Sequence, residues 1–306
     1  MLRKAVLATA LTLVLSACAT TPGADPQAAP AAPAAAAAPV AQQVAPSPPA
    51  APTAQERAED ALKRAVGGNW RSRENGVRDA YRNPVQTLTY FGVEPQHTVI
   101  EITPGAGWYS EILAPYLREQ GQYIAAVVDP MTLAGDRRDF FLKSKTALEE
   151  KFAAAPEQFD RARVVGYDPT APSLGPAGSA DVVLTFRNVH NWYSNGQAEG
   201  MFKAFFAVLK PGGTLGIVEH RAISEVTPDD RSGYMGQAQV TAMAQAAGFI
   251  PAGHSQINAN ARDTKDHPNG VWTLPPLNRH DEADAAKYRT IGESDRMTLR
   301  FHKPGA

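Results

Sequence analysis

Two short clusters in this chain carry residue types suited to acid–base chemistry. Arg187, His190 and Trp192 lie in the segment FRNVHNW, directly after an apolar run, and His220 lies in EHR after another. An imidazole exchanges protons near neutral pH, so His190 and His220 are candidate general bases. Arg187 and Trp192 belong to the polar, aromatic cluster where a substrate is expected, and Arg187 would suit an anionic group. The alternatives are structural: a hydrogen-bonded histidine, or an arginine that braces its loop.

A glycine-containing loop is the candidate ligand site. The segment TVIEITPGAG places an apolar, β-branched run before Gly105 and Gly107. Because glycine has no Cβ, backbone N–H groups in such a loop can closely approach a polar or charged ligand. Glu101 ends this run, and Asp129 ends the next one, 22 residues after Gly107, a spacing suited to an acid that binds ribose hydroxyls. A nicotinamide-binding fingerprint would instead have Gly or Ala where this chain has Ser110.

Residues 258–276 form a third polar segment. It contains Asp263, Asp266 and His267, which are all possible metal ligands. Their spacing fits no closed metal site, so we expect a lid or substrate loop and no metal.

Strand and helix patterns alternate after residue 54. Helical patterns cover residues 54–66, 71–81, 108–117, 139–152 and 201–209. Strand patterns cover residues 97–102, 123–128, 162–165, 181–186, 214–219, 249–254 and 297–302. Such alternation predicts a parallel sheet with helices on both faces, whose ligands bind beyond the carboxyl ends of the strands. The last two strands have no clear helix between them, which indicates an antiparallel hairpin that closes the sheet.

The order of these pieces resembles class I S-adenosylmethionine-dependent methyltransferases. The resemblance rests on E-x-T-x-G-x-G, Asp129, the strand DVVL, the turn LKPGG and a closing antiparallel strand, and it covers about residues 85–304. More narrowly, GVEPQHTVIEITPGAGWYSEILAPYL, RNVHNW and DRMTLRFHKP resemble a bacterial group of predicted methyltransferases. The resemblance implies a doubly wound, seven-stranded Rossmann-like methyltransferase sheet with a C-terminal antiparallel hairpin. It also implies S-adenosylmethionine as the cofactor.

The resemblance assigns roles to individual residues as well. Glu101 would lie near the methionine amino group, Asp129 would hold the ribose hydroxyls, and Asp168 would lie near the adenine. Two positions depart from the family pattern. Thr103 replaces the usual first glycine of the loop, and Asp168 is displaced by one residue from the usual Gly-Asp spacing. The implied cofactor-binding positions are Glu101, Thr103, Gly105, Gly107, Asp129 and Asp168.

The N-terminal residues indicate export and a lipid anchor. The segment MLRKAVLATALTLVLSAC has a basic start, an apolar stretch too short to span a bilayer and the ending LSAC, which resembles a bacterial lipobox. Cys18 is the single cysteine of the chain. We predict a lipoprotein signal peptide over 1–17, a lipidated Cys18 followed by an Ala/Pro-rich disordered tether over 18–54, and a methyltransferase-like domain over 55–306. The alternative is an ordinary signal peptide with an incidental cysteine.

The composition and motifs exclude several classes of substrate and binding partner. A net charge of −1 gives no electrostatic case for nucleic acid. No Asn/Asp-Pro-Pro-aromatic tetrad follows the fourth strand, which argues against methylation of amino groups of DNA adenine or of glutamine. The lone Cys18 excludes a cysteine nucleophile acting on pyrimidine C5. We expect a small-molecule substrate and a membrane contact through Cys18, whereas the sequence does not indicate an oligomeric state.

Three functional hypotheses follow. The favoured one is methyl transfer to a small-molecule or lipid-like acceptor by a protein tethered in the cell envelope, facing the periplasm, with Ala19 favouring the outer membrane. The second is a methyltransferase fold that binds a nucleoside-like or other envelope ligand without turnover. The third is an enzyme that is not exported. The acids Glu101 and Asp129 favour a functional cofactor pocket, because a buried carboxylate without a partner is costly.

Overall fold

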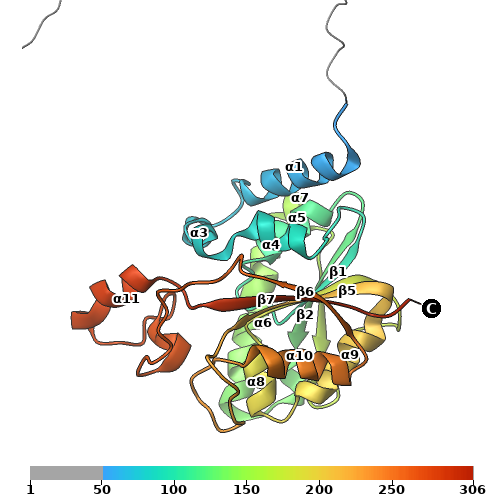
Figure 1. Ribbon diagram of the computed structural model, residues 1–306. Coiled ribbons are helices and arrows are strands. Elements are labelled where there is room, and N and C mark those ends of the chain that lie inside the picture. Colours follow the sequence, from blue (N-terminus) through green and yellow to red (C-terminus); the bar gives the residue numbers. More distant parts are fainter. Residues whose placement is uncertain (1–50, 306) are drawn as a thin grey trace, which may run out of the picture. The chain divides into compact units, whose positions relative to one another are not determined.

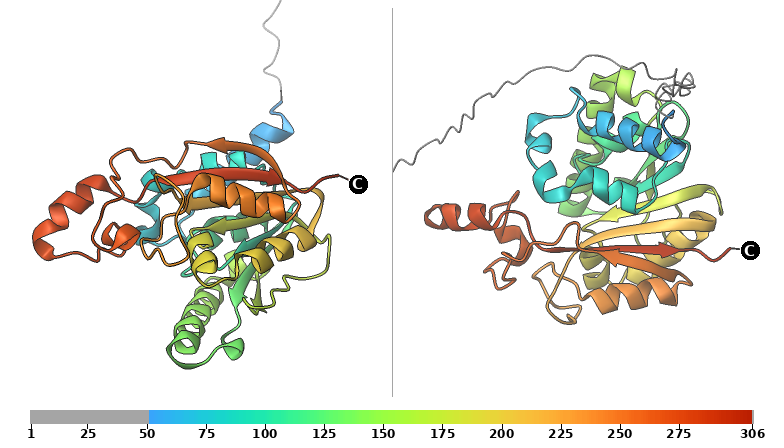
Figure 2. Two further views of the ribbon diagram at one scale, coloured as in Figure 1. Left: turned by 60° about the horizontal axis from the view of Figure 1, so that its bottom comes forward. Right: turned by 45° about the horizontal axis from the view of Figure 1, so that its top comes forward.

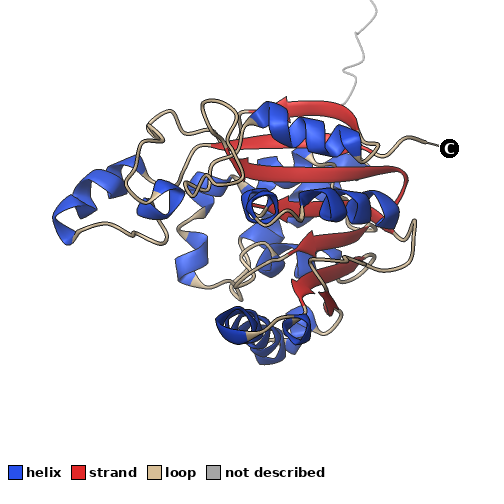
Figure 3. Cartoon of the chain, turned by 90° about the horizontal axis from the view of Figure 1, so that it is seen from below, coloured by secondary structure: helices blue, strands red, loops and turns tan. Residues whose placement is uncertain are grey.

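A twisted seven-stranded sheet forms the centre of the computed structural model, which describes residues 51–305 (Figure 3). The strand order is β3-β2-β1-β4-β5-β7-β6, in which β3 to β5 run parallel and β7 is antiparallel to both of its neighbours. The strands are β1 (Thr98–Ile102), β2 (Gln122–Val128), β3 (Arg163–Tyr167), β4 (Ala180–Phe186), β5 (Leu209–His220), β6 (Ile250–Ser255) and β7 (Arg296–His302). The predicted doubly wound sheet and its C-terminal antiparallel hairpin are confirmed.

Helices cover both faces of this sheet (Figure 1). Against one face pack α1 (Ala54–Val66), α4 (Pro84–Tyr90), α5 (Ser110–Leu117), α6 (Gly135–Ala154) and α7 (Pro156–Phe159). Against the other pack α8 (Val189–Ser194), α9 (Ala198–Val208) and α10 (Gln237–Ala246). Side chains of β1 alternate between the two layers, with Val99 in the first cluster and Ile100 and Ile102 in the second.

The remaining helices are short and lie beyond one end of the sheet. These are α2 (Arg73–Gly76), α3 (Asp79–Arg82), α11 (Ala285–Ile291) and the 3₁₀ helices η1 (Pro130–Thr132), η2 (Gly270–Thr273) and η3 (Glu282–Asp284). Figure 2 shows α11 projecting from the end of the sheet opposite to the C-terminus. The parallel strands end on this side, so the N-terminal and C-terminal segments both reach the predicted ligand-binding edge.

Several element predictions are wrong. The single helix expected over 71–81 is instead α2 and α3, and α4 follows directly from Asn83, whose left-handed backbone (φ 42°) redirects the chain before Pro84. Helices α8 and α10 were not predicted, and α11 lies in the stretch between the last two strands that was expected to lack a helix. These are short or weakly amphipathic segments, whose helices depend on tertiary packing more than on their own sequence pattern.

The predictions for the N-terminus lie outside the described residues. These are the signal peptide over 1–17, lipidation at Cys18 and nearly all of the tether. None of the helices within residues 51–305 is long and apolar enough to cross a membrane.

Candidate active site

A cavity of about 850 Å³ opens at the carboxyl ends of the parallel strands. Its floor comes from the loop after β1, the segment after β4 and the end of β5. Residues from α2, α3 and α6 form part of its wall, and the segment between β6 and β7 closes it from the other side. Its lining includes Arg78, Arg82, Glu101, Thr103, Gly105, Ala106, Tyr109, Phe140, Phe141, Arg187, Asn188, His190, Trp192, His220, Trp272, Glu293 and Ser294.

The loop after β1 has the left-handed turns that a glycine-containing ligand loop requires. Thr103 has φ 51°, which is unusual for a β-branched residue, and Gly105 and Gly107 have φ 59° and 77°. Thr103 is held by its backbone N–H, which donates to the Ala126 carbonyl at 2.7 Å, and by a 2.7 Å hydrogen bond between its hydroxyl and that of Tyr167. Gly105 lines the cavity.

Gly107 has a packing role in this loop. A Cβ at Gly107 would lie 2.7 Å from Cδ1 of Leu148 on α6, so glycine allows helix and loop to pack closely. Gly107 is buried and does not line the cavity.

Glu101 brings a buried acid to the cavity. Only 2% of the residue is exposed, and its carboxylate accepts hydrogen bonds from the hydroxyls of Tyr123 at 2.6 Å and Ser110 at 3.3 Å. Burial raises the pKa of Glu101 to about 7, although both hydroxyls oppose the shift. The side chain can therefore gain or lose a proton near neutral pH.

The other two predicted acids lie apart from the cavity. Asp129 follows β2 as predicted, but its carboxylate caps η1 by accepting from the Met131 N–H at 3.0 Å. The Asp168 carboxylate accepts from the N–H and hydroxyl of Thr170 at 2.8 and 2.7 Å. Neither residue lines the cavity. The structure thus brings Glu101, Thr103 and Gly105 together with Arg187, His190, Trp192 and His220, and leaves Gly107, Asp129 and Asp168 outside the lining.

His190 is oriented by a fully buried carboxylate, that of Glu219. One Glu219 oxygen is 3.0 Å from Nδ1 of His190 and accepts from the His220 N–H at 2.8 Å, and the other accepts from the Val189 N–H at 2.6 Å. Because both amide partners are donors, the carboxylate acts as an acceptor throughout, so His190 Nδ1 carries the hydrogen. Nε2 of His190 is then the free basic nitrogen, and Glu219 can stabilise the imidazolium that forms on proton uptake.

His220 has a different environment from His190, although the ring centroids are 5.5 Å apart. Its Nδ1 shares a 2.5 Å hydrogen bond with the Ser294 hydroxyl. Burial, and then the nearby His190 and Arg187, hold the pKa of His220 well below its usual value. His220 therefore stays neutral at physiological pH and is poorly suited to accept a proton.

Arg187 and Trp192 both line the cavity, with different surroundings. Arg187 immediately follows β4 with φ 64°, a left-handed backbone fixed by its N–H donating to the Val218 carbonyl at 2.7 Å. Trp192 is only 4% exposed and packs edge-on against Phe205 at 5.5 Å between centroids, so most of its surface belongs to the core.

The residues 190, 219 and 220 also form the one group with metal-ligand geometry in the part of the chain that the structure describes, with ligand atoms within 4.8 Å of one another. Both Glu219 oxygens already accept N–H hydrogen bonds, so these three residues are connected by hydrogen bonds to the Glu219 carboxylate. In the loop over 258–276, Asp263 and His267 are buried and paired at 2.9 Å, whereas the Asp266 side chain is 81% exposed. Trp272 of that loop lines the cavity.

Several residues that build the site were not predicted from the sequence. Glu219, which orients His190 from behind the cavity lining, was noted only as part of the EHR segment. Arg78 was expected in the helix over 71–81, and Arg82 lay outside every predicted element. Glu293 and Ser294 arrive from the chain just before the last strand. A weak signal was present, because Arg78 and Arg82 are four residues apart and would share one face of a helix.

Comparisons with known proteins agree with this architecture. No protein-family model matches the chain, and no curated protein matches it. Among solved structures, a SAM dependent methyltransferase from Aquifex aeolicus aligns with a TM-score of 0.50 and 14% identity, over 80% of this chain and 98% of that one. The [4+2]-cyclase SpnF aligns with a TM-score of 0.53 and 15% identity, over 84% of this chain and 98% of that one. Identities this low show the fold alone, which is the Rossmann-like methyltransferase fold.

Proposed function

We propose that this protein binds S-adenosylmethionine in the cavity and transfers its methyl group to a small-molecule acceptor. The proposal is carried by one juxtaposition: the loop Thr103–Ala106 and Glu101 share a single cavity with His190, which the buried Glu219 orients. A cofactor loop and an oriented base are the two parts that this reaction needs from a protein.

The residues present fit the cofactor at its methionine end. Gly105 adopts a left-handed backbone at the cavity wall, and a Cβ built there meets no protein atom within 4 Å, so the loop leaves open space beside its backbone. The Glu101 carboxyl reaches the same cavity and would suit an ammonium group. At the ribose end, the residue predicted to hold the ribose hydroxyls, Asp129, instead caps η1 and lies outside the lining. A volume of about 850 Å³ is within the range of small-molecule sites.

Bound S-adenosylmethionine would supply an electrophilic methyl group for in-line attack by the acceptor. His190 would take the proton of an attacking hydroxyl or amine at Nε2, while Glu219 on Nδ1 fixes the ring and stabilises its positive charge. His220 would contribute a neutral hydrogen-bonding wall beside Ser294. The aromatic rings of Tyr109 and Phe186, stacked at 3.6 Å, would limit the access of water to the reacting atoms.

The proposed setting remains the cell envelope, with attachment through Cys18. This part rests on the lipobox-like segment LSAC and on the single cysteine. A small-molecule or lipid-like acceptor from the envelope would be compatible with it. The competing hypothesis is a binding module that uses the same cavity without turnover.

Calorimetric titration of S-adenosylhomocysteine, the expected product, into the full chain tests the cofactor site. We expect a dissociation constant on the order of micromolar and a loss of at least about tenfold in Gly105→Ala, because the new methyl group would enter the cofactor space. Gly178→Ala is the matched control: Gly178 has φ 66° and equally open surroundings but lies outside the cavity lining.

The two glycine variants should lose similar stability, since alanine is strained at either position. Equal affinities in both variants, or no heat with the wild-type chain at millimolar ligand, would reject the cofactor site. Binding of both S-adenosylmethionine and its product, with no methyl transfer to any envelope extract, would favour the binding module.

A further inference from the structure

One cation in the cavity lacks a partner. The Arg187 guanidinium lines the cavity and forms no hydrogen bond or ion pair with any other residue of the described range 51–305. It is held there by a left-handed backbone conformation (φ 64°), which is strained for a non-glycine residue. Arg187 is only partly buried, so its guanidinium is open to the cavity and can be reached by a ligand there.

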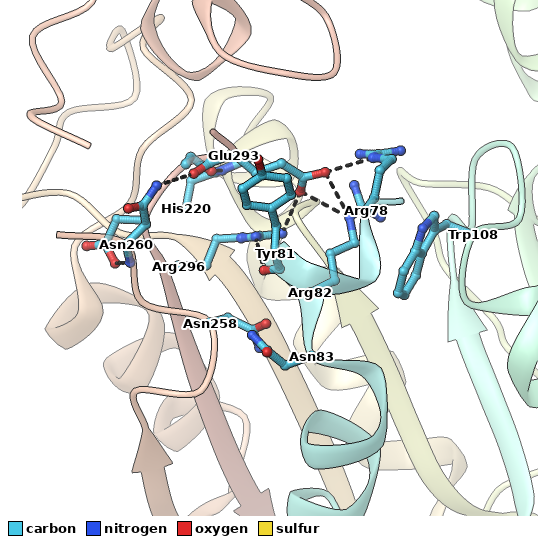
Figure 4. A network of polar contacts seen from close by, with 12 residues as sticks. Arg78, Tyr81, Arg82, Asn83, Trp108, His220, Asn258, Asn260, Glu293 and Arg296 are labelled. Carbon is cyan, nitrogen blue, oxygen red and sulfur yellow. Dashed lines mark hydrogen bonds and ion pairs between the residues drawn. The ribbon is translucent and has the colours of Figure 1, made fainter. Parts of the chain in front are cut away.

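Two further arginines beside it are only partly satisfied (Figure 4). Arg78 and Arg82 each donate Nε to the Glu293 carboxylate, at 2.7 and 3.0 Å. Their Nη2 atoms are buried and have no hydrogen-bond partner within the described part of the chain. Arg82 is 1% exposed, and its guanidinium lies 4.8 Å from the Trp108 ring centroid, a cation–π contact.

Arg78 and Arg82 share a single carboxylate, that of Glu293. Glu293 also accepts from Nη1 of Arg296 at 3.0 Å, so four guanidiniums, including that of Arg187, surround one fully ionised acid. Burial opposes ionisation of Glu293, but Arg296 and then Arg82 outweigh it and hold the pKa at about 2. Burial and then Arg187 lower the pKa of Arg82 well below its usual value. Glu101 also lies within electrostatic reach of Arg187 and Arg82, but the four arginines outnumber these two acids, so the cluster carries an excess of positive charge at the cavity wall.

We propose that Arg187, Arg82 and Arg78 form an anion-binding subsite for a carboxylate or phosphate group of the small molecule that enters the cavity. Guanidinium groups bind such anions through charge-assisted, often bidentate hydrogen bonds. The partly exposed Arg187 offers its guanidinium to the cavity, and Arg82 and Arg78 add positive charge beside it. Resting on the proposed function, the subsite belongs to the methyl acceptor, which is accordingly an anionic molecule.

The cofactor's own carboxylate is the other possible source of an anion. The charge balance favours the acceptor, because one cofactor carboxylate would still leave the arginines in excess over the acids. The cofactor is itself a net cation, with a sulfonium and an ammonium group, and would add to the excess.

Malonate, a small dicarboxylate, and inorganic phosphate are the probes. Each is titrated calorimetrically into the full chain, with and without saturating S-adenosylhomocysteine. We expect malonate to bind in both conditions, Arg187→Met to weaken it at least about tenfold, and Arg187→Lys to retain part of the affinity. Arg163→Met is the matched control, because Arg163 is exposed on β3 and lies outside the cavity lining.

If Arg187→Met does not fold, Arg78→Met replaces it and should also weaken malonate binding. Arg78 is more exposed than Arg82, the other arginine that donates Nε to Glu293, so its substitution should disturb the fold less. Competition between malonate and S-adenosylhomocysteine would overturn the assignment to the acceptor. No binding of either probe, or equal weakening by Arg163→Met, would overturn the subsite itself. Malonate binding that Arg187→Met abolishes, in a chain that does not bind S-adenosylhomocysteine, would uphold the subsite and reject the proposed function.

Discussion

At the scale of single residues, environment separates groups that look equivalent in the sequence. His190 and His220 both follow strands at the same edge, yet only His190 has a carboxylate on Nδ1. His220 shares its Nδ1 with a serine hydroxyl and is surrounded by positive charge. Glu101 differs from Asp168 in the same way: burial raises the pKa of Glu101 to about 7, whereas hydrogen bonds from Thr170 lower the pKa of Asp168.

The raised pKa of Glu101 predicts a pH dependence of cofactor binding. If the ionised carboxylate binds the ammonium group, affinity for S-adenosylhomocysteine should rise about tenfold between pH 6 and 8, as Glu101 loses its proton near pH 7. Glu101→Gln should bind weakly and with no such rise. Calorimetry at several pH values measures this, and a slope that persists unchanged in Glu101→Gln would assign the titration to another group.

At the scale of elements, the two central strands end alike. Thr103 follows β1 and Arg187 follows β4, and each adopts a left-handed backbone that is costly for a residue with a side chain. The side-chain amide of Asn188 joins these ends by donating to the Ile102 carbonyl at 3.0 Å. Strain of this kind concentrates at sites where geometry serves a ligand, and both residues line the cavity.

The strain at Thr103 predicts that the larger truncation, Thr103→Gly, destabilises the protein less than Thr103→Val. Thr103→Gly removes more atoms than Thr103→Val, but glycine relieves the left-handed conformation. Valine keeps that strain, and both substitutions remove the hydroxyl that bonds the buried Tyr167 hydroxyl, so the backbone strain decides the order. We therefore expect Thr103→Val to be the less stable variant, by about 1–2 kcal/mol. Urea denaturation of both variants tests this, and the opposite order would show that the backbone at Thr103 is unstrained.

At the scale of the whole molecule, Glu293 joins segments 211 residues apart in the sequence. It connects α2–α3 to the start of β7, and two further bonds strengthen the junction. Arg296 Nη2 donates to the Tyr81 carbonyl at 2.6 Å, and the Asn83 amide donates to the Ile257 carbonyl at 2.7 Å (Figure 4). The cavity is therefore enclosed by chain segments that come from opposite ends of the described range.

This junction predicts a specific loss of stability in acid. Because the folded pKa of Glu293 lies near 2, below its ordinary value of 4.5, its contribution is complete above about pH 4.5 and is lost as the pH falls towards 2. Glu293→Gln should reduce the free energy of unfolding by about 3 kcal/mol at pH 7, and the difference from wild type should shrink between pH 4.5 and 2.

Chemical denaturation at pH 7, 5 and 3 measures the effect. Glu199→Gln is the matched control, because Glu199 forms an exposed ion pair with Lys203 and should change stability little. A Glu293→Gln variant whose deficit is the same at pH 3 as at pH 7 would assign the junction to packing rather than to charge.

The sequence by itself determined the architecture and the region of the site. Alternating apolar runs, β-branched strands and the glycine loop are local signals, and a parallel sheet brings the ends of its strands to one edge whatever the details of packing. For this reason, seven residues that the sequence singled out do line one cavity: Glu101, Thr103, Gly105, Arg187, His190, Trp192 and His220.

Only the tertiary structure decided which of these groups can do chemistry. Hydrogen-bond partners, burial and charge balance depend on residues distant in sequence: Glu219 for His190, Ser294 for His220, and Glu293 for Arg82. Short helices such as α3 carry little pattern of their own, so the place of Arg82 beside the cavity was not predicted. A strand can be predicted from its own residues, because its pattern of apolar side chains is local. The partners of a buried charge depend on tertiary contacts between distant segments.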